Sequence, residues 1–182
     1  VITFGTFSGL AGIFGLLIAN LYGSSAFGDQ GVDPLRYAFL GALVGSLARI
    51  IAGPIADRVG GGRITVVATI GIAASALYSS FQVSPTSPDD FPRFLVGMIA
   101  IFFFAGVGNA STFKQMPMIF ERRQAGGVIG WTSAIAAYGP FIFGMMLSAV
   151  APGLLFGMGV VFALVAAAVS WWFYARPGAE KP

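Results

Sequence analysis

Arg49 is the residue whose position in this sequence raises a chemical question. It lies within an apolar stretch, nine residues before Arg58. At about 1.5 Å per helical residue it would sit about 13 Å from the end of that stretch, near the middle of a bilayer. An arginine there costs at least about 2.5 kcal/mol on insertion scales. Something in its surroundings must therefore compensate the guanidinium.

None of the carboxylates in the chain is placed by sequence to neutralise Arg49. They lie at the ends of apolar stretches, in loops or in the C-terminal tail: Asp29, Asp33, Asp57, Asp89, Asp90, Glu121 and Glu180. The guanidinium must then meet a carboxylate from another part of the protein, backbone carbonyls and water, or a diffusible anion. Cations within a membrane mark substrate or ion pathways, and a guanidinium offers planar, paired N–H donors. These properties favour a functional role for Arg49.

The composition is that of a membrane protein. Of 182 residues, 57% are hydrophobic and 9% are charged, against about 25% charged in soluble domains. The absence of cysteine and histidine excludes thiolate and imidazole chemistry and nearly all zinc, haem and iron–sulfur sites, so we expect no cofactor. The spans also lack the nucleophile–base pair that an enzyme would need, so enzyme activity is not expected. The net charge of +3 is spread thinly and predicts no nucleic-acid partner.

Six apolar runs approach the ~20 residues that a helix needs to cross a bilayer. Turn residues and charges separate them. Runs of this length disfavour a β-barrel, whose strands would alternate over about ten residues. The sequence therefore predicts an all-α membrane protein with spans at about 1–22, 37–57, 64–82, 94–116, 126–149 and 154–174.

The cations fall unequally on the two sides of these spans. Arg36 and Arg93 lie on one side, and the other receives six: Arg58, Arg63, Arg122, Arg123, Arg176 and Lys181. The positive-inside rule makes the six-cation side cytoplasmic, which predicts a multi-pass protein of the inner (plasma) membrane with both ends of this segment in the cytoplasm. Lys114 can extend its ammonium to the same interface.

The given sequence begins at Val1, inside an apolar run. We therefore expect the chain to be a fragment.

Glycines recur at helical spacing on either side of Arg49. Gly41, Gly45 and Gly53 recur at four-residue spacing with Arg49 and so share one helix face. Such a stripe either lets another helix approach closely or leaves room around the guanidinium.

Four polar residues lie inside the later spans: Asn109, Ser111, Thr112 and Ser133. Each either lines a pathway or forms an ordinary hydrogen bond between helices or within its own helix. Pro117 is expected to end or bend the fourth span.

The turn after the second span carries a recognisable motif. Gly-Pro-Ile-Ala-Asp-Arg-Val-Gly-Gly-Gly-Arg at 53–63 resembles the loop between the second and third helices of each six-helix half in the major facilitator superfamily. This resemblance implies that the chain forms one half of that fold and needs an N-terminal six-helix half as its partner. It also implies a cytoplasmic latch formed by Gly53, Asp57, Arg58, Gly60 and Arg63.

Further segments narrow the resemblance. Residues 4–7, 47–49, 106–113 and 116–120 are similar to the C-terminal half of nitrate/nitrite porters, and 126–139 is similar to their second signature. The resemblance implies that Arg49 and an arginine from the other half clamp the planar anion, that Phe4 lines the site, and that Gly130, Ser133 and Gly139 lie on a helix beside the pathway. The signature departs from its glycine-rich pattern at Ala136, Ala137, Tyr138 and Pro140.

The expected function is transport of nitrate and nitrite by alternating access, with Arg49, Phe4, Gly130, Ser133 and Asn109 binding the anion. Exchange of nitrate for nitrite is the simpler mode, because this segment offers no histidine and no carboxylate deep inside its spans to relay a proton. The expected partners are nitrate, nitrite, the absent N-terminal half and the lipid bilayer. The alternatives are a porter for another small or organic anion, and a membrane scaffold subunit that transports nothing.

Overall fold

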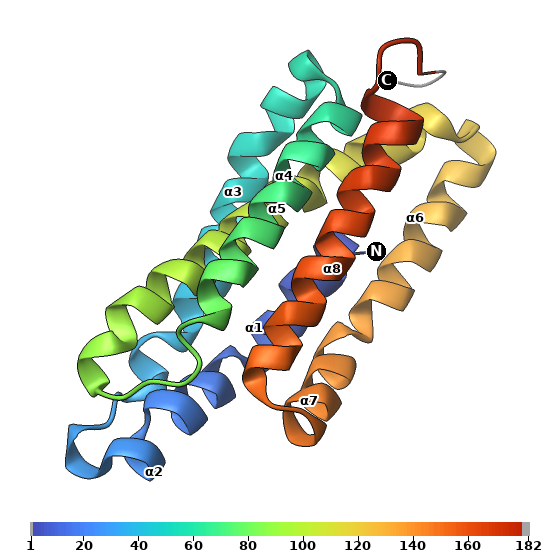
Figure 1. The fold of residues 1–182 in the computed structure, drawn as a ribbon. Helices are drawn as coiled ribbons and strands as arrows, with labels where there is room; N and C mark the ends of the chain where they lie inside the picture. The colour runs from blue at the N-terminus through green and yellow to red at the C-terminus, as the bar shows by residue number, and fades with distance from the viewer. Residues whose placement is uncertain (1, 180–182) are drawn as a thin grey trace.

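The computed structural model describes residues 2–179, and within that range the chain consists of helices joined by short turns (Figure 1). Val1, Glu180 and Lys181, which entered the expectations above, lie outside the described residues. The α-helices are α1 Ile2–Tyr22, α2 Ser24–Phe27, α3 Ala38–Val59, α4 Gly61–Ser80, α5 Phe91–Ile119, α6 Arg122–Ala137, α7 Gly139–Ala149 and α8 Pro152–Ser170. Single 3₁₀ turns occupy Gly28–Gln30, Pro34–Arg36 and Pro88–Asp90, and a π-helical turn, Trp171–Ala175, follows α8.

Within residues 2–179, six helical segments are long and apolar enough to cross a membrane, and each of them overlaps one of the six expected ranges. The predicted all-α fold is therefore confirmed, and it is consistent with one half of a major facilitator fold. The segments are Ile2–Gln30, Pro34–Val59, Gly61–Ser80, Pro88–Ile119, Arg123–Ala149 and Pro152–Ala175.

Helix α5 is the centre of the packing. It lies against α3 on one side and α4 on the other, α8 packs on α4, and α7 packs on α1. The side chains of Phe14 and Leu17 from α1 meet Phe94 and Phe102 from α5 in a core that is fully buried. Because lipid is as apolar as these side chains, their contribution to the bundle comes from close van der Waals packing between the helices. This core holds α1 against α5.

The charged residues separate between the two ends of the bundle. The α3–α4 turn, the α5–α6 turn and the C-terminal end of α8 lie together at the top of Figure 1; we call this the basic end, after Arg58, Arg63, Arg123 and Arg176. The opposite end carries Arg36 and Arg93, which pair with Asp33 and Asp90 at 3.5 and 3.3 Å. Helix α1 begins partway along the bundle, so only the C-terminal end of the described chain lies at the basic end.

The span expected at 126–149 is broken into α6 and α7 at Tyr138. Pro140 has no N–H, so it cannot donate to the carbonyl of Ala136 as a continuous helix would require. The Ser8 hydroxyl of α1 donates to that carbonyl instead, at 2.9 Å. The break is therefore stabilised by a neighbouring helix.

The C-terminal ends of α3 and α5, both at the basic end, are terminated in different ways. Helix α5 continues through Pro117 to Ile119, so the proline does not itself stop the helix. Helix α3 stops at Gly60, whose φ is +99°. A residue with a side chain is strained at such an angle. Glycine is therefore required at this position for α3 to turn directly into α4.

Candidate functional site

The backbones of α3 and α5 touch at a pair of glycines. A Cβ atom added to Gly106 would overlap the carbonyl oxygen of Gly45, and one added to Gly45 would overlap the ring of Phe7. A Cβ on Gly41 would likewise overlap the ring of Phe102. Close helix approach is thus the correct reading of the glycine stripe at these two positions, which leave no room for a ligand.

A groove of about 530 Å³ opens between the two helices, on the side of Arg49. Its walls are one face of each helix, because the lining positions recur at intervals of three and four residues. They are Ser46, Arg49, Ile50 and Gly53 from α3, and Asn109, Ala110, Phe113 and Lys114 from α5.

Arg49 is half-buried midway along α3 and has no acidic partner in the part of the chain that the structure describes. Its Cζ atom lies 6.0 Å from the centre of the Phe7 ring, at the outer limit of a cation–π interaction. That interaction contributes about 0.5–2 kcal/mol and leaves the guanidinium donors free. The charge that required compensation on sequence grounds still requires it in the folded chain.

Asn109 is the second unsatisfied group in the groove. Its side chain is fully buried, yet neither Oδ1 nor Nδ2 has a hydrogen-bond partner. An unpaired buried amide costs about 1–3 kcal/mol. Its neighbours behave differently: Ser111 shares a 2.8 Å hydrogen bond with Thr65, and Thr112 donates to Gly108 of its own helix at 2.7 Å. The ordinary structural role therefore holds for Ser111 and Thr112 and fails for Asn109.

Aromatic rings form one wall of the groove. Phe113 lines it directly, and Phe4 meets Phe113 edge to face with ring centres 5.8 Å apart. Phe7 meets Phe102 in the same way at 6.0 Å. Phe4 is therefore placed behind Phe113, from where it supports the wall of the groove.

Lys114 is the groove residue that sequence reasoning missed. The sequence placed it near the cytoplasmic interface. The structure shows in addition that Lys114 lines the groove and that its Nζ pairs with Oδ2 of Asp57, which joins α3 and α5. Lys114 follows Ala110, another residue of the groove, by four positions, which places those two on one helix face. Its five-residue spacing from Asn109 gave no such signal in the sequence. Gly53 lies beside the lysine stem, and a Cβ added there would lie 3.5 Å from Lys114 Cε, which is an ordinary contact distance.

The α3–α4 turn, expected as a latch, packs closely against its surroundings. Asp57 contacts Lys114 of α5, whereas Arg58 and Arg63 are exposed and have no carboxylate partner among the described residues. A Cβ on Gly62 would lie 2.8 Å from the Tyr174 backbone oxygen. Gly62 therefore serves the close packing of this turn against the segment that follows α8.

Gly130 and Ser133 of α6 do not line this groove. Gly130 faces open space and Ser133 is half-buried. Helix α6 is held to α1 by the Ser8–Ala136 hydrogen bond and by Gly139, whose added Cβ would lie 2.6 Å from the Gly5 carbonyl oxygen. Within residues 2–179 no cluster of three or more acidic side chains could hold a metal ion.

Comparison with known proteins identifies relatives of this chain. No known family profile matches it. A probable nitrate/nitrite antiporter NarK2 of Thermus thermophilus is 56% identical over the whole chain. Two nitrate/nitrite transporters NarU, of Escherichia coli (strain K12) and Salmonella typhimurium, are 29% and 28% identical over 96% of it. The chain spans 42% of the length of each of these relatives.

These relatives confirm the resemblance that the motifs indicated, and all three carry the names of transporters rather than enzymes. These alignments cover the full chain or nearly so, and they therefore include the segments that form the groove. The chain is therefore a homologue of part of the nitrate/nitrite transporters and a multi-pass membrane protein.

Proposed function

We propose that this chain is the C-terminal six-helix half of a major facilitator transporter that moves nitrate and nitrite by alternating access. The observation that carries the proposal is the unneutralised guanidinium of Arg49 in the α3–α5 groove. The transporter names of the relatives, and the 42% of their length that the chain spans, support it. The remaining length is sufficient for a second half that covers the groove.

The chemistry of the groove suits a small planar anion. Arg49 offers paired N–H donors, which match two oxygens of nitrate or nitrite. The Nδ2 atom of Asn109 is a donor without a partner, so binding would satisfy a group that is otherwise costly to bury. The ring of Phe113 excludes water from one side and thereby strengthens the charge-assisted hydrogen bonds.

The open side of the groove is where the second half would lie. Ser46 and Ile50 line the groove and are exposed in this chain. An arginine from the other half, approaching over these residues, completes a clamp around the anion. The basic end is cytoplasmic by the positive-inside rule, and exchange across the inner membrane requires no proton relay in this half.

Substitution of Arg49 tests the proposal. Arg49→Gln should reduce nitrate affinity by at least tenfold, since a charge-assisted hydrogen bond contributes about 1.5–3 kcal/mol. Arg49→Lys should lose most of the affinity as well, because an ammonium cannot match two oxygens at once. Nitrate binding by calorimetry and nitrate–nitrite exchange in proteoliposomes provide the measurements, with the full-length protein as the sample.

Arg36→Gln is the matched control, because it removes an exposed cation at the opposite end of the bundle. It should leave nitrate affinity unchanged. If Arg49→Gln folds, assembles and still binds nitrate with the original affinity, the proposal is wrong and the chain is better described as a scaffold.

A porter for a larger anion is the second candidate, and the groove volume of about 530 Å³ favours it. Closure by the second half would reduce that volume, which is why nitrate and nitrite remain the first proposal. Competition against labelled nitrate by small carboxylates and larger organic anions separates the two. Displacement by the larger anions at lower concentrations than by nitrite would favour the second candidate.

A further inference from the structure

The ion pair between Lys114 and Asp57 places a second cation on the groove that holds Arg49. Lys114 belongs to α5 and Asp57 to the last turns of α3, so the pair joins the two walls of the groove. Lys114 lines the same hollow as Arg49 and Asn109. Its position distinguishes it from Arg58 and Arg63, which are exposed at the α3–α4 turn and do not line the groove.

We propose that Lys114 is a second anion-contacting residue and that Asp57 is a positioning residue that competes with the anion for it. In the empty groove Lys114 rests on Asp57; when a monovalent oxyanion enters, the ammonium turns to the anion and releases Asp57. This inference rests on the proposed function, because it assigns additional residues to the same site.

The pair is weak enough for an anion to displace. The side chains of Lys114 and Asp57 are 41% and 58% exposed, and exposed ion pairs contribute little to stability. A lysine ammonium has three donors on a flexible stem. It can therefore move from one acceptor to another without disturbing the backbone of α5.

The surroundings of Lys114 leave it this freedom. Gly53 lies beside the lysine stem. Even a Cβ added at Gly53 would lie 3.5 Å from Lys114 Cε, which is an ordinary contact distance. The groove extends from Lys114 past Phe113 to Asn109 and Arg49. A small anion held at Arg49 thus shares one continuous hollow with the ammonium.

The charges that this chain places at the groove favour an anion. Arg49 and Lys114 contribute two positive charges, and Asp57, which pairs with Lys114 without lining the groove, contributes one negative charge. The net charge from this chain is therefore a single positive charge, to which the arginine proposed from the other half adds a second. Because binding frees Asp57 at the start of the α3–α4 turn, occupancy of the groove alters the only ion pair between α3 and α5 in the described chain.

The test uses Lys114→Gln, Lys114→Arg and Asp57→Asn in the full-length protein, with nitrate as the probe. Lys114→Gln should weaken nitrate binding about tenfold, and Lys114→Arg should restore most of it, as expected for loss and return of a charge-assisted hydrogen bond. Asp57→Asn should bind nitrate more tightly by a few-fold, because the competitor is gone. The KM for uptake should move in the same directions as the dissociation constant.

The double variant Asp57→Asn/Lys114→Gln isolates the competition. If Asp57 acts through Lys114, its removal should have no effect on nitrate affinity once Lys114 is absent. A purely structural latch predicts the opposite pattern: both single variants would lower the amount of folded protein or kcat, and neither would change nitrate affinity. That result would overturn the inference, as would weaker binding by Asp57→Asn.

Failure here and failure of the proposed function give different results. If nitrate binding depends on Arg49 but not on Lys114, the proposed function stands and this inference is wrong. If binding depends on neither residue, both are wrong. Arg36→Gln again controls for loss of a positive charge remote from the groove.

Discussion

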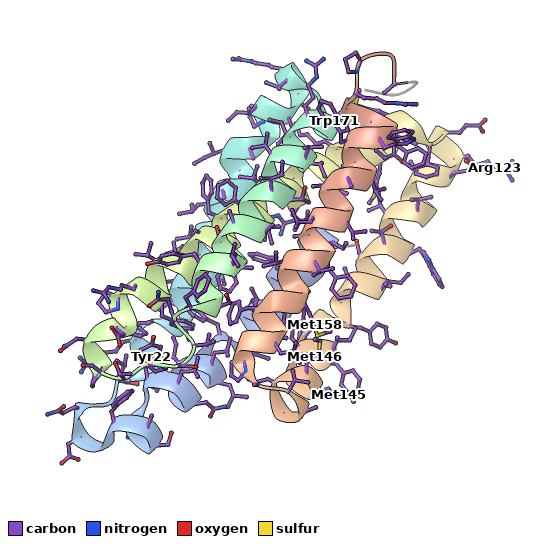
Figure 2. The ribbon with its side chains drawn as sticks, in the orientation of Figure 1. Tyr22, Arg123, Met145, Met146, Met158 and Trp171 are labelled. Atoms are coloured by element: carbon purple, nitrogen blue, oxygen red, sulfur yellow. The ribbon has the colours of Figure 1, made fainter. Side chains whose placement is uncertain are left out.

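The two regions at either end of α5 are built on opposite principles. At the end away from the basic residues, Tyr22 is fully buried, its ring centre lies 5.1 Å from that of Phe94, and its hydroxyl donates to the Gln82 carbonyl at 2.7 Å. Figure 2 shows Tyr22 at that end of the bundle, far from Trp171. Farther along α5, the groove contains the unneutralised Arg49 and the unpaired amide of Asn109.

This difference separates residues that hold the fold from residues that remain available. We call the end of α5 around Tyr22, Phe91 and Phe94 the aromatic end. The hydroxyl of Tyr22 is satisfied within the chain, so this end gains nothing from a ligand. The groove retains a charge and an amide whose partners are absent from the described residues. Variants at the aromatic end should therefore change stability alone, and variants in the groove should change affinity.

The largest effect is expected from Phe94→Ala at the aromatic end. Phe94 is fully buried against Phe14, Tyr22 and Phe91, and truncation of such a ring costs about 3–5 kcal/mol. Thermal unfolding in detergent should show a large decrease in the midpoint. The folded fraction should bind nitrate with unchanged affinity; weaker binding by that fraction would show that the two regions are coupled.

Gly106→Ala should have the next largest effect, because it acts where packing and groove meet. The new Cβ would overlap the Gly45 carbonyl oxygen, which forces α3 and α5 apart at a cost of about 1–3 kcal/mol. Both the unfolding midpoint and nitrate affinity should fall. Gly157→Ala is the matched control, since its Cβ would meet nothing within 4 Å, and neither quantity should fall in it.

Asn109→Leu should separate affinity from stability. Replacing an unpaired buried amide with an apolar side chain removes a group that costs about 1–3 kcal/mol to bury, so the unfolding midpoint should stay the same or rise. Nitrate binding should weaken about tenfold. The neighbouring Ser111→Ala should show the reverse, because Ser111 is bonded to Thr65 and does not line the groove. Equal effects of the two variants would refute the distinction between them.

The smallest effect is expected from Tyr22→Phe. It removes the hydrogen bond to the Gln82 carbonyl and little else, which should lower the free energy of unfolding by about 1 kcal/mol. Nitrate affinity should not change. Chemical denaturation of the purified protein measures the first quantity and calorimetry the second.

The fold was accessible from the sequence because its cause is local. Runs of about twenty apolar residues separated by turn residues require helices that cross a bilayer, and the six spans follow from that count. The break at Tyr138 was not expected, although Pro140 was visible and a proline inside a helix is enough to kink or break it. The sequence could not show that the hydroxyl of Ser8 satisfies the freed carbonyl of Ala136, because that contact joins two distant segments.

The site was accessible only in part. Arg49 stood out because a cation within an apolar run has a high energetic cost regardless of the fold. Asn109 was ambiguous beside Ser111 and Thr112, since all three are polar residues on one span and only their packing shows which are satisfied. The pairing of Lys114 with Asp57 was not predicted, because the two residues lie 57 positions apart in the chain and only the packing of α3 on α5 brings them together.

The sequence by itself determined that this chain crosses a membrane with helices and carries a cation within an apolar span with no carboxylate placed beside it, because hydrophobicity and charge are properties of single residues. The tertiary structure decided which residues share the groove with that cation. The approach of α3 and α5 at Gly45 and Gly106 brings Asn109 and Lys114 beside Arg49, and such proximity depends on side-chain packing between distant segments, which no local pattern encodes.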